Sequence, residues 1–324
     1  MDRREFLKAS GLLGTAALAG APELLTASAP QKFRIGLAAT QWLQAEASAK
    51  TYWQACKEIG SLGFRGTEAD DTLSDLDIDY GEKIADFKRE TAKYGPELKG
   101  IFYLFHFDPE KMPGERKRAA HICRFLNGVG ARYIATGEGI RLRTGSQVNF
   151  KEEAREEAQT KYTARDVKNA IQGLNELGKL CKEDYGVAIA FHPGRNQTKE
   201  LIQQVLNETD PRYVSFCADV GHLTGAGYDP VEAVRTYASR LVASHWKDYD
   251  PNIPLRHTEE NEGLKGDFVE LGKGIVNFPA LAELFGEIGY SGWVMLELDR
   301  TMTTPLESAR EMKAYVVDKL KLQV

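Results

Sequence analysis

Short apolar runs recur along this chain of 324 residues, and the intervals between them leave room for one helix each. The runs are rich in β-branched and aromatic residues, a composition typical of buried strands. The sequence predicts eight such strands: Phe33 to Ala39, Phe64 to Glu68, Leu98 to Phe105, Tyr133 to Thr136, Val187 to Phe191, Tyr213 to Cys217, Leu241 to Ser244 and Trp293 to Glu297.

The segments between these strands carry apolar residues spaced as on one face of a helix. The predicted helices are Ser48 to Ile59, Ile84 to Lys93, Glu115 to Asn127, Ala164 to Glu183, Lys199 to Glu208, Pro230 to Ala238, Phe278 to Ile288 and Pro305 to Leu320. Eight strand and helix units in residues 30–324 match the size of a single (β/α)8 barrel of the TIM type, which is the predicted fold. An open doubly wound sheet is the main alternative, but the chain lacks both a G-x-G-x-x-G after the first strand and a G-x-x-x-x-G-K-S/T motif.

The first 29 residues differ from the rest of the chain. Arg3 and Arg4 precede a mild apolar run from Ala9 to Ala21, and Ala27-Ser28-Ala29 has the form of a cleavage site. This order resembles a twin-arginine export signal, and the apolar run is too short to span a bilayer core of about 30 Å. We therefore expect a signal peptide at 1–29, export by the twin-arginine machinery to the periplasm or another exported location, and no stable membrane anchor. The barrel domain is then expected at 30–324. The alternative is that residues 1–29 form an amphipathic first helix of that domain.

Composition excludes some classes of protein. The chain is 42% apolar and 27% charged, which is ordinary for a globular protein with a large core. Its net charge of −5 does not suit the phosphate neutralisation that nucleic-acid binding requires. The four cysteines, Cys56, Cys123, Cys181 and Cys217, have no C-x-x-C spacing and are predicted to be buried thiols. The sequence leaves the oligomeric state open, a homo-oligomer included.

The stretch from Tyr213 to Asp248 places polar residues at the ends of two neighbouring strands. One apolar run ends at Asp219 and the next at His245, with a crossover segment between them. The carboxyl ends of parallel strands are where α/β folds bind ligands. The pair is therefore predicted to hold a divalent metal. The alternatives are that Asp219 caps the next turn and that His245 is a hydrogen-bonded core residue.

The same end of the barrel receives a histidine or a carboxylate from seven of the eight predicted strands. These residues are Glu68, His106, Glu138, His192, Asp219, His245 and Glu297. Because desolvating an unpaired charge costs several kcal/mol, such groups are expected to be paired or bound to metal. Carboxylate oxygens and imidazole nitrogens without thiolates favour Mn or Mg as the cofactor, with Co, Fe and Zn as alternatives.

Five motifs, taken in order, resemble the xylose isomerase-like TIM barrel superfamily, which includes sugar phosphate isomerase/epimerases, inosose dehydratases and endonuclease IV. They are Leu62 to Glu68 (LGFRGTE), Asp219 to His222 (DVGH), His245 to Asp248 (HWKD), Leu271 to Gly274 (LGKG) and Trp293 to Asp299 (WVMLELD). The resemblance implies that Asp219, His245 and Glu297 are metal ligands and that strand five supplies a fourth. Epimerases of the superfamily commonly carry Glu there as both ligand and base. This chain has His192 instead, which resembles branches that include dehydratase-like members.

Four residues are candidates for catalysis: Glu138, Glu297, His222 and Lys247. We expect His222 to face the substrate, Lys247 to orient or protonate an oxyanion, and the two glutamates to carry protons. Structural interpretations stay open for three of them. Glu297 could pair with Arg300, Lys247 could pair with Asp248 or another carboxylate, and Glu138 could lie on a loop surface.

Substrate contacts are expected from Glu68, His106 and Trp42, with the Trp42 ring as an apolar wall for a sugar unless it belongs to the core. Arg256 and His257 are also candidates. They lie in the segment Tyr249 to Gly272, whose length is typical of a lid over a site.

The predicted reaction is removal of the proton next to the carbonyl of a keto-sugar or sugar derivative, with metal stabilising the enediolate. Reprotonation gives isomerisation or epimerisation, whereas loss of a β-substituent gives a lyase acting, for example, on a 3-keto-glucoside. Two alternatives come from other classes. One is an endonuclease IV-like phosphodiesterase, which the negative charge disfavours, and the other is a non-catalytic periplasmic barrel that binds sugar.

Overall fold

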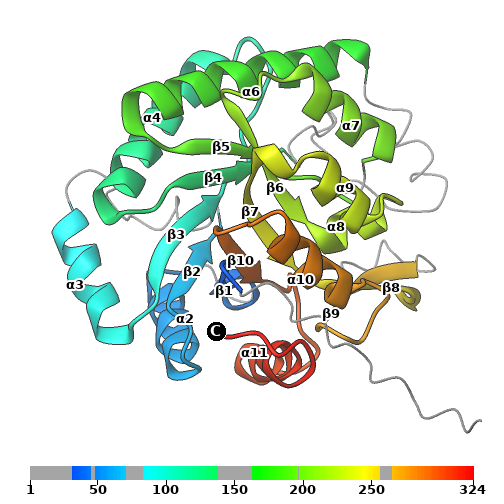
Figure 1. Ribbon diagram of the computed structural model, residues 1–324. Coiled ribbons are helices and arrows are strands. Elements are labelled where there is room, and N and C mark those ends of the chain that lie inside the picture. Colours follow the sequence, from blue (N-terminus) through cyan, green and yellow to red (C-terminus); the bar gives the residue numbers. More distant parts are fainter. Residues whose placement is uncertain (1–30, 45–47, 71–82, 138–162, 196, 256–264) are drawn as a thin grey trace, which may run out of the picture.

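The computed structural model describes residues 31–44, 48–70, 83–137, 163–195, 197–255 and 265–324. Eight parallel strands close into a barrel in the order β1-β10-β7-β6-β5-β4-β3-β2 (Figure 1). These strands are β1 (Arg34–Ala38), β2 (Gly66–Ala69), β3 (Glu97–Phe102), β4 (Tyr133–Thr136), β5 (Ala188–Phe191), β6 (Val214–Asp219), β7 (Leu241–Trp246) and β10 (Trp293–Leu296). The predicted (β/α)8 barrel is therefore confirmed.

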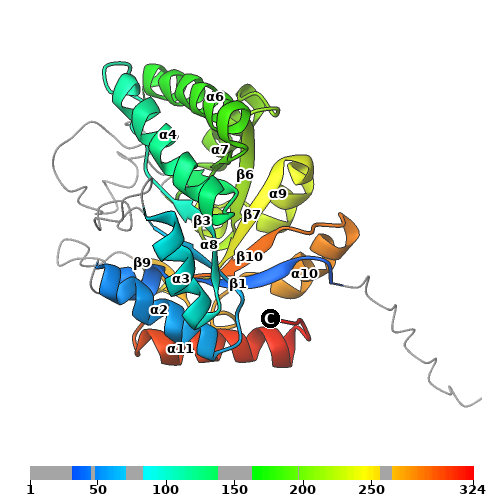
Figure 2. The ribbon, with the colours of Figure 1, turned by 90° about the vertical axis from the view of Figure 1, so that its left-hand side faces the viewer.

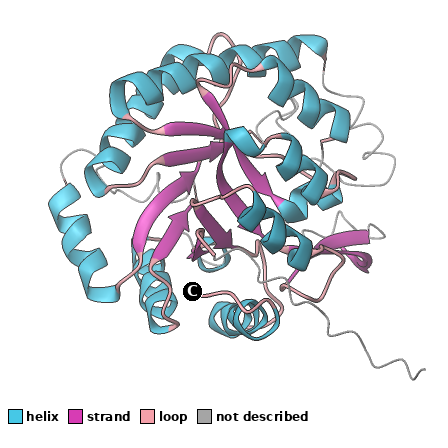
Figure 3. Ribbon diagram, in the orientation of Figure 1, coloured by secondary structure: helices cyan, strands magenta, loops and turns pink. Residues whose placement is uncertain are grey.

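Helices cover the outside of the barrel and leave the strands at the centre (Figure 3). They are α1 (Thr40–Leu43), α2 (Ala49–Ser61), α3 (Ile84–Tyr94), α4 (Met112–Val129), α6 (Ala164–Tyr185), α7 (Lys199–Glu208), α8 (Val220–Gly225), α9 (Pro230–Thr236), α10 (Phe278–Glu287) and α11 (Pro305–Ala314), with short turns η2 (Ala238–Arg240) and η4 (Tyr315–Lys319). The last helix, α11, packs beside α2, so the end of the chain closes the ring next to its beginning (Figure 2).

The helix boundaries follow from capping residues in the sequence. Thr163 begins α6 with a capping box, in which its side chain accepts the Asp166 N–H and the Asp166 carboxylate accepts the Thr163 N–H. Gly186 ends the same helix with φ +66°, a left-handed conformation that costs glycine little. Such caps satisfy backbone groups that a helix leaves unpaired, and they keep each connection to the next strand short.

Two cores fill the molecule. The larger one lies between strands and helices, and the smaller one is inside the barrel, where Ala135, Ala190, Cys217 and Ala243 surround the ring of Tyr133. Small side chains on several strands therefore leave room for one large ring. All four cysteines are buried and free, as predicted.

The structure corrects two details of the expected topology. The segment Tyr249 to Gly272, expected as a lid loop, contains an antiparallel hairpin of β8 (Asp248–Pro254) and β9 (Lys265–Val269) outside the barrel (Figure 1). Its two strands are mostly polar or contain proline, yet Tyr249 and Phe268 are both buried. The crossover between β6 and β7 holds two helices, α8 and α9, where one was expected. Among the described residues, no helix is both long and apolar enough to cross a membrane.

Candidate metal centre

Strand register brings four of the predicted ligands together at the carboxyl end of the barrel. Asp219 on β6 and His245 on β7 are direct register partners. Glu297 follows β10 and donates its backbone N–H to the carbonyl of Trp246. It therefore lies two residues beyond Met295, the register partner of His245, toward the carboxyl end of the barrel. His192 follows β5, the strand that pairs with β6. The candidate ligand atoms of His192, Asp219, His245 and Glu297 lie within 4.8 Å of one another, and all four residues are buried.

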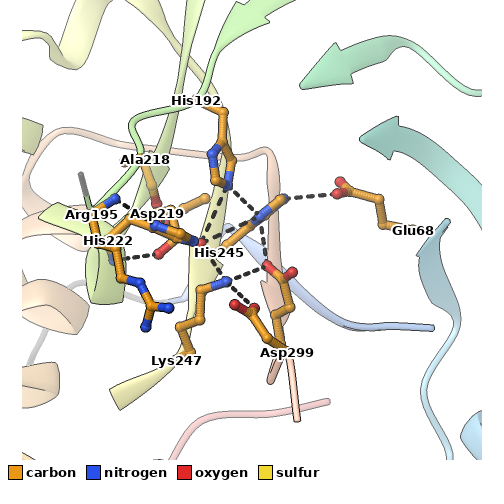
Figure 4. A network of polar contacts seen from close by, with 12 residues as sticks. Glu68, His192, Arg195, Ala218, Asp219, His222, His245, Lys247 and Asp299 are labelled. Carbon is orange, nitrogen blue, oxygen red and sulfur yellow. Dashed lines mark hydrogen bonds and ion pairs between the residues drawn. The ribbon is translucent and has the colours of Figure 1, made fainter. Parts of the chain in front are cut away.

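The distances within this cluster identify which atoms converge. His192 Nε2 lies 3.2 Å from His245 Nδ1 and 3.3 Å from Asp219 Oδ2 (Figure 4). His245 Nδ1 is 2.7 Å from Glu297 Oε2 and 3.7 Å from Asp219 Oδ2. Two imidazole nitrogens and two carboxylate oxygens therefore face a common point.

Asp219 performs two tasks with its two oxygens. Oδ1 accepts the backbone N–H of His222 at 2.8 Å and so begins α8, while Oδ2 faces the cluster. The cap fixes the rotation of the carboxylate and so aims the second oxygen. The structural alternative for Asp219, capping of the next turn, is thus present together with the predicted contact to His245.

Lys247 adds a cation beside these ligands. Its Nζ lies 2.6 Å from Asp299 Oδ1, 3.2 Å from Asp219 Oδ2 and 3.5 Å from Glu297 Oε2. The neighbouring Asp248 points elsewhere and accepts backbone N–H groups from the loop that contains Gly272, Gly274 and Val276. Lys247 therefore pairs with carboxylates of the cluster and of Asp299.

The electrostatic environment favours the charged forms of these groups. Burial would raise the pKa of Glu297, but Lys247 and His245 lower it to about 2. Burial acts in the same way on Asp219, where Lys247, His222 and His192 hold the pKa well below its usual value. Burial would lower the pKa of Lys247, but the surrounding carboxylates raise it well above the usual range, so its ammonium stays charged.

The residues present fit a divalent cation. Asp219 Oδ2 and Glu297 Oε2 are buried and make no hydrogen bond of good geometry among the described residues, although buried polar atoms normally make one. The Lys247 ammonium lies 3.2 and 3.5 Å from them. A set of two imidazole nitrogens and two carboxylate oxygens is one that Mn, Fe, Co and Zn accept. A divalent cation would add positive charge at the point where these two oxygens and the two imidazole nitrogens face one another.

His222 lines the adjoining cavity and is oriented by the backbone. Its Nδ1 accepts the N–H of Arg195 at 2.9 Å, so the neutral ring carries its proton on Nε2. Burial, with Lys247 nearby, lowers the pKa of this imidazole well below its usual value. His222 therefore offers a neutral N–H donor, in keeping with the prediction that it faces the substrate.

A cavity of about 160 Å³ adjoins the cluster. The described residues that line it are Thr40, Gln44, Asp70, Phe102, Leu104, His192, His222, Lys247, Glu297 and Asp299. Sequence reasoning missed Asp70 and Asp299. Each stands two residues after a glutamate at a strand end, and because side chains alternate along a strand, this spacing could have indicated the same face.

Other predicted substrate contacts lie away from this cavity. Trp42 is buried in the core and donates its indole N–H to Glu58 at 2.8 Å. His106 is exposed and lies four residues past Phe102, where β3 ends. Glu68 is buried behind His245 and does not line the cavity. Glu138, Arg256 and His257 lie outside the described residues, as does the predicted signal at 1–29.

The fold and the cluster together define a (β/α)8 barrel whose catalytic end carries a buried site suited to a divalent metal. The chain belongs to the xylose isomerase-like TIM barrel family, whose pattern matches residues 54–316.

Relatives of known name extend this assignment. The chain is 25% identical over 305 residues to an inosose dehydratase of Clostridium botulinum, with 90% of this chain and 98% of that protein covered. It is 29% identical over 276 residues to an inosose dehydratase of Mesomycoplasma hyopneumoniae, which covers 81% of this chain and 87% of the relative.

Among solved structures, the IolI protein with a bound zinc atom superposes with a TM-score of 0.63 at 19% identity, covering 89% of this chain and 98% of the other. An L-ribulose 3-epimerase superposes with a TM-score of 0.65 at 14% identity, covering 89% and 95% of the two chains. At these identities the superpositions speak for the fold alone. The relatives and the family together indicate a sugar-modifying enzyme of the isomerase, epimerase or lyase kind, as the sequence predicts.

Proposed function

We propose that this chain catalyses a metal-dependent β-elimination from a keto-sugar or a related cyclic ketone. The reaction begins with removal of the proton next to the carbonyl. The observation that carries this proposal is the position of Lys247, whose ammonium lines the cavity 3.5 Å from the Glu297 carboxylate. A cation and a proton acceptor side by side suit a reaction in which one bond to hydrogen and one bond to oxygen are broken in the same molecule.

The residues of the cavity have distinct tasks in this scheme. Glu297, Asp299 and Asp70 are the carboxylates of the cavity lining, and one of them accepts the proton and returns it to the departing oxygen, so that water or an alcohol leaves. Lys247, which stays an ammonium, donates a hydrogen bond to the oxygen that gains negative charge, and the His222 N–H supplies a second donor. A divalent cation held by His192, Asp219, His245 and Glu297 would act as a Lewis acid toward the same charge.

Two considerations favour elimination over epimerisation. The strand-five position carries His192, an imidazole within the cluster, where epimerases of the family commonly place a glutamate base. In addition, the relatives that match most of this chain are named inosose dehydratases, a name that denotes loss of water. We therefore propose inososes and 3-keto-glucosides as the substrates to test first.

The test is to incubate the metal-loaded protein with ketoses, inososes and 3-keto-glucosides in D₂O and to follow the products by NMR. Elimination is expected to give an unsaturated ketone, and chelation by EDTA should abolish it. An epimer with deuterium at the α-carbon would support isomerisation instead. Tight sugar binding without turnover would favour the binding-protein alternative, and cleavage of an abasic-site duplex the phosphodiesterase.

We also propose that residues 1–29 export the folded protein to the periplasm through the twin-arginine machinery. The paired Arg3 and Arg4, the apolar run and the Ala27-Ser28-Ala29 site support this proposal. Fractionation of cells that produce the full chain should recover protein beginning near residue 30 outside the cytoplasm. Replacement of both arginines by lysine should retain it inside, and equal export of both forms would contradict the proposal.

A further inference from the structure

Tyr133 lies inside the barrel and crosses a neighbouring strand. It is on β4, and its register partner on β3 is Gly100, which in turn pairs with Glu68 on β2. A Cβ atom on Gly100 would lie 2.3 Å from the Tyr133 ring, so the ring rests directly on the backbone of this glycine. Only a residue without a side chain leaves this path open. Three adjacent strands are thus shaped so that the Tyr133 hydroxyl reaches β2.

The Tyr133 hydroxyl donates a hydrogen bond to Glu68 Oε2. The other carboxylate oxygen, Oε1, lies 2.9 Å from His245 Nε2, and Glu68 lies on the other side of His245 from His192 and Asp219 (Figure 4). His245 in turn directs Nδ1 toward the cluster of ligand atoms. The contacts form a chain from β4 through β2 to the candidate ligand on β7.

This chain is dry. Tyr133 and Glu68 are each 2% exposed, and His245 is 1% exposed. Burying a carboxylate in a barrel lined by alanine and cysteine is costly, and one tyrosine hydroxyl offsets only part of that cost. The contact to His245 is what gives the second oxygen a partner. We therefore expect Glu68 to orient the His245 imidazole and not merely to fill space in the barrel.

We propose that Glu68 and Tyr133 are positioning residues of the metal centre: Glu68 holds the Nε2 proton of His245 so that Nδ1 presents its lone pair to the cation, and Tyr133 fixes Glu68. The proposal rests on the metal centre of the proposed function, but it is independent of which reaction occurs there. Carboxylates behind a ligating histidine set its tautomer and ring orientation and raise its basicity. This assignment replaces the expectation that Glu68 contacts the substrate.

The experiment measures metal binding by competition with a chromophoric chelator, using Zn²⁺ and Mn²⁺ as probes. Glu68→Gln removes the charge but keeps the shape, and it is expected to raise the Kd about 10- to 100-fold. Tyr133→Phe removes one hydrogen bond to Glu68 and is expected to raise the Kd about 3- to 10-fold. The double variant should bind within about twofold of Glu68→Gln, because the tyrosine acts through the glutamate.

The matched control is Tyr290→Phe. Tyr290 is also buried, and its hydroxyl bonds to the carbonyls of Val242 and Trp293 at the other end of the barrel. This variant loses the same atom and should keep the parent Kd even if its melting temperature falls. The absorption spectrum of bound Co²⁺ should change in Glu68→Gln and Tyr133→Phe and stay unchanged in the control.

Three outcomes would overturn the proposal: a Glu68→Gln protein with the parent Kd, an equal loss of affinity in the two tyrosine variants, or a parent chain that binds no divalent ion. If Glu68→Gln does not fold, the Kd values of Tyr133→Phe and Tyr290→Phe test the proposal, because only Tyr133→Phe should bind metal more weakly than the parent. A parent protein that binds metal but performs no elimination refutes the proposed reaction and leaves the positioning role intact.

Discussion

The two ends of the barrel treat buried polar groups in opposite ways. At the amino end, Arg240 is almost fully buried and donates to the carbonyls of Val214 and Leu206 and to the hydroxyl of Thr209. At the carboxyl end, Asp219 Oδ2 and Glu297 Oε2 are buried beside Lys247 and the other ligand atoms, and they make no hydrogen bond of good geometry among the described residues. At the amino end the buried guanidinium is hydrogen-bonded. At the carboxyl end two buried carboxylate oxygens remain available to bind a cation.

The amino end of the barrel therefore contributes mainly to stability, and the carboxyl end carries the candidate metal site. A guanidinium with several carbonyl partners joins η2, α7 and β6 and contributes to folding whether or not a ligand is bound. At the carboxyl end the carboxylates pair with Lys247 and the histidines, and a bound cation would stabilise the folded protein further by mass action. The comparison therefore predicts that only substitutions at the carboxyl end change metal affinity.

The largest effect is expected from Asp219→Asn. Asn keeps the oxygen that caps α8 but removes the charged oxygen of the cluster, so metal affinity should fall by more than the ~100-fold typical of residues behind a ligand. The free energy of unfolding of the metal-free protein should fall as well, because the buried Lys247 loses one of its carboxylate partners. Chelator competition and urea unfolding would test the two parts. Unchanged affinity would remove Asp219 from the ligand set.

Arg240→Met should lower stability and leave metal affinity unchanged. Loss of the guanidinium leaves buried carbonyl oxygens at Val214 and Leu206 without that donor, which should lower the free energy of unfolding by about 2–3 kcal/mol. Metal affinity of the folded protein should equal that of the parent. Denaturant unfolding and the competition assay measure both quantities. A marked loss of affinity would show that the two ends are coupled.

The pH dependence of metal binding provides a further test of the carboxyl end, where a proton and a metal ion would compete for His245. Burial would lower the pKa of His245, but Cys217, Glu68 and Glu297 raise it well above the usual value in the metal-free protein. This raised pKa stabilises the metal-free fold below the unfolded-state pKa of about 6.5, and the contribution is lost as pH rises through the folded value. Metal requires an unprotonated nitrogen, so its stabilising effect should grow with pH over the same window.

Melting temperatures recorded with and without Mn²⁺ from about pH 6 to pH 9 would test this prediction. The difference between the two curves should widen with rising pH. Asp219→Asn, which is expected to bind little metal, provides the control and should show no such widening. A difference that stays constant with pH in the parent would argue that no proton competes with the metal.

The smallest effect is expected from Tyr290→Phe at the amino end. Its hydroxyl lies 2.9 Å from the carbonyl of Trp293 and 3.1 Å from that of Val242, and losing this contact should cost about 1 kcal/mol of stability. Thermal unfolding measures the change. A cost above that of Arg240→Met would contradict the view that the guanidinium dominates this end.

Much of the architecture follows from local patterns. The eight strands, most helix boundaries and the residues that end each strand could be predicted from the sequence, because apolar periodicity, capping residues and turn glycines act over a few residues. The same reasoning named His192, Asp219, His245 and Glu297, since a parallel barrel brings all strand ends to one rim. The hairpin β8–β9 escaped prediction because its strands contain no run of apolar residues and two of their buried side chains, Asp248 and Asp267, are charged.

What the sequence alone determined is the barrel and the rim residues available to it, because the periods of strands and helices are local properties. Only the tertiary structure decided which of those residues converge. His106 follows β3 but is exposed. Glu68, in contrast, contacts both His245 and Tyr133, whose ring passes over the backbone of Gly100. Such contacts depend on register, closure and the direction of each side chain, and these are set by strands far apart in the chain.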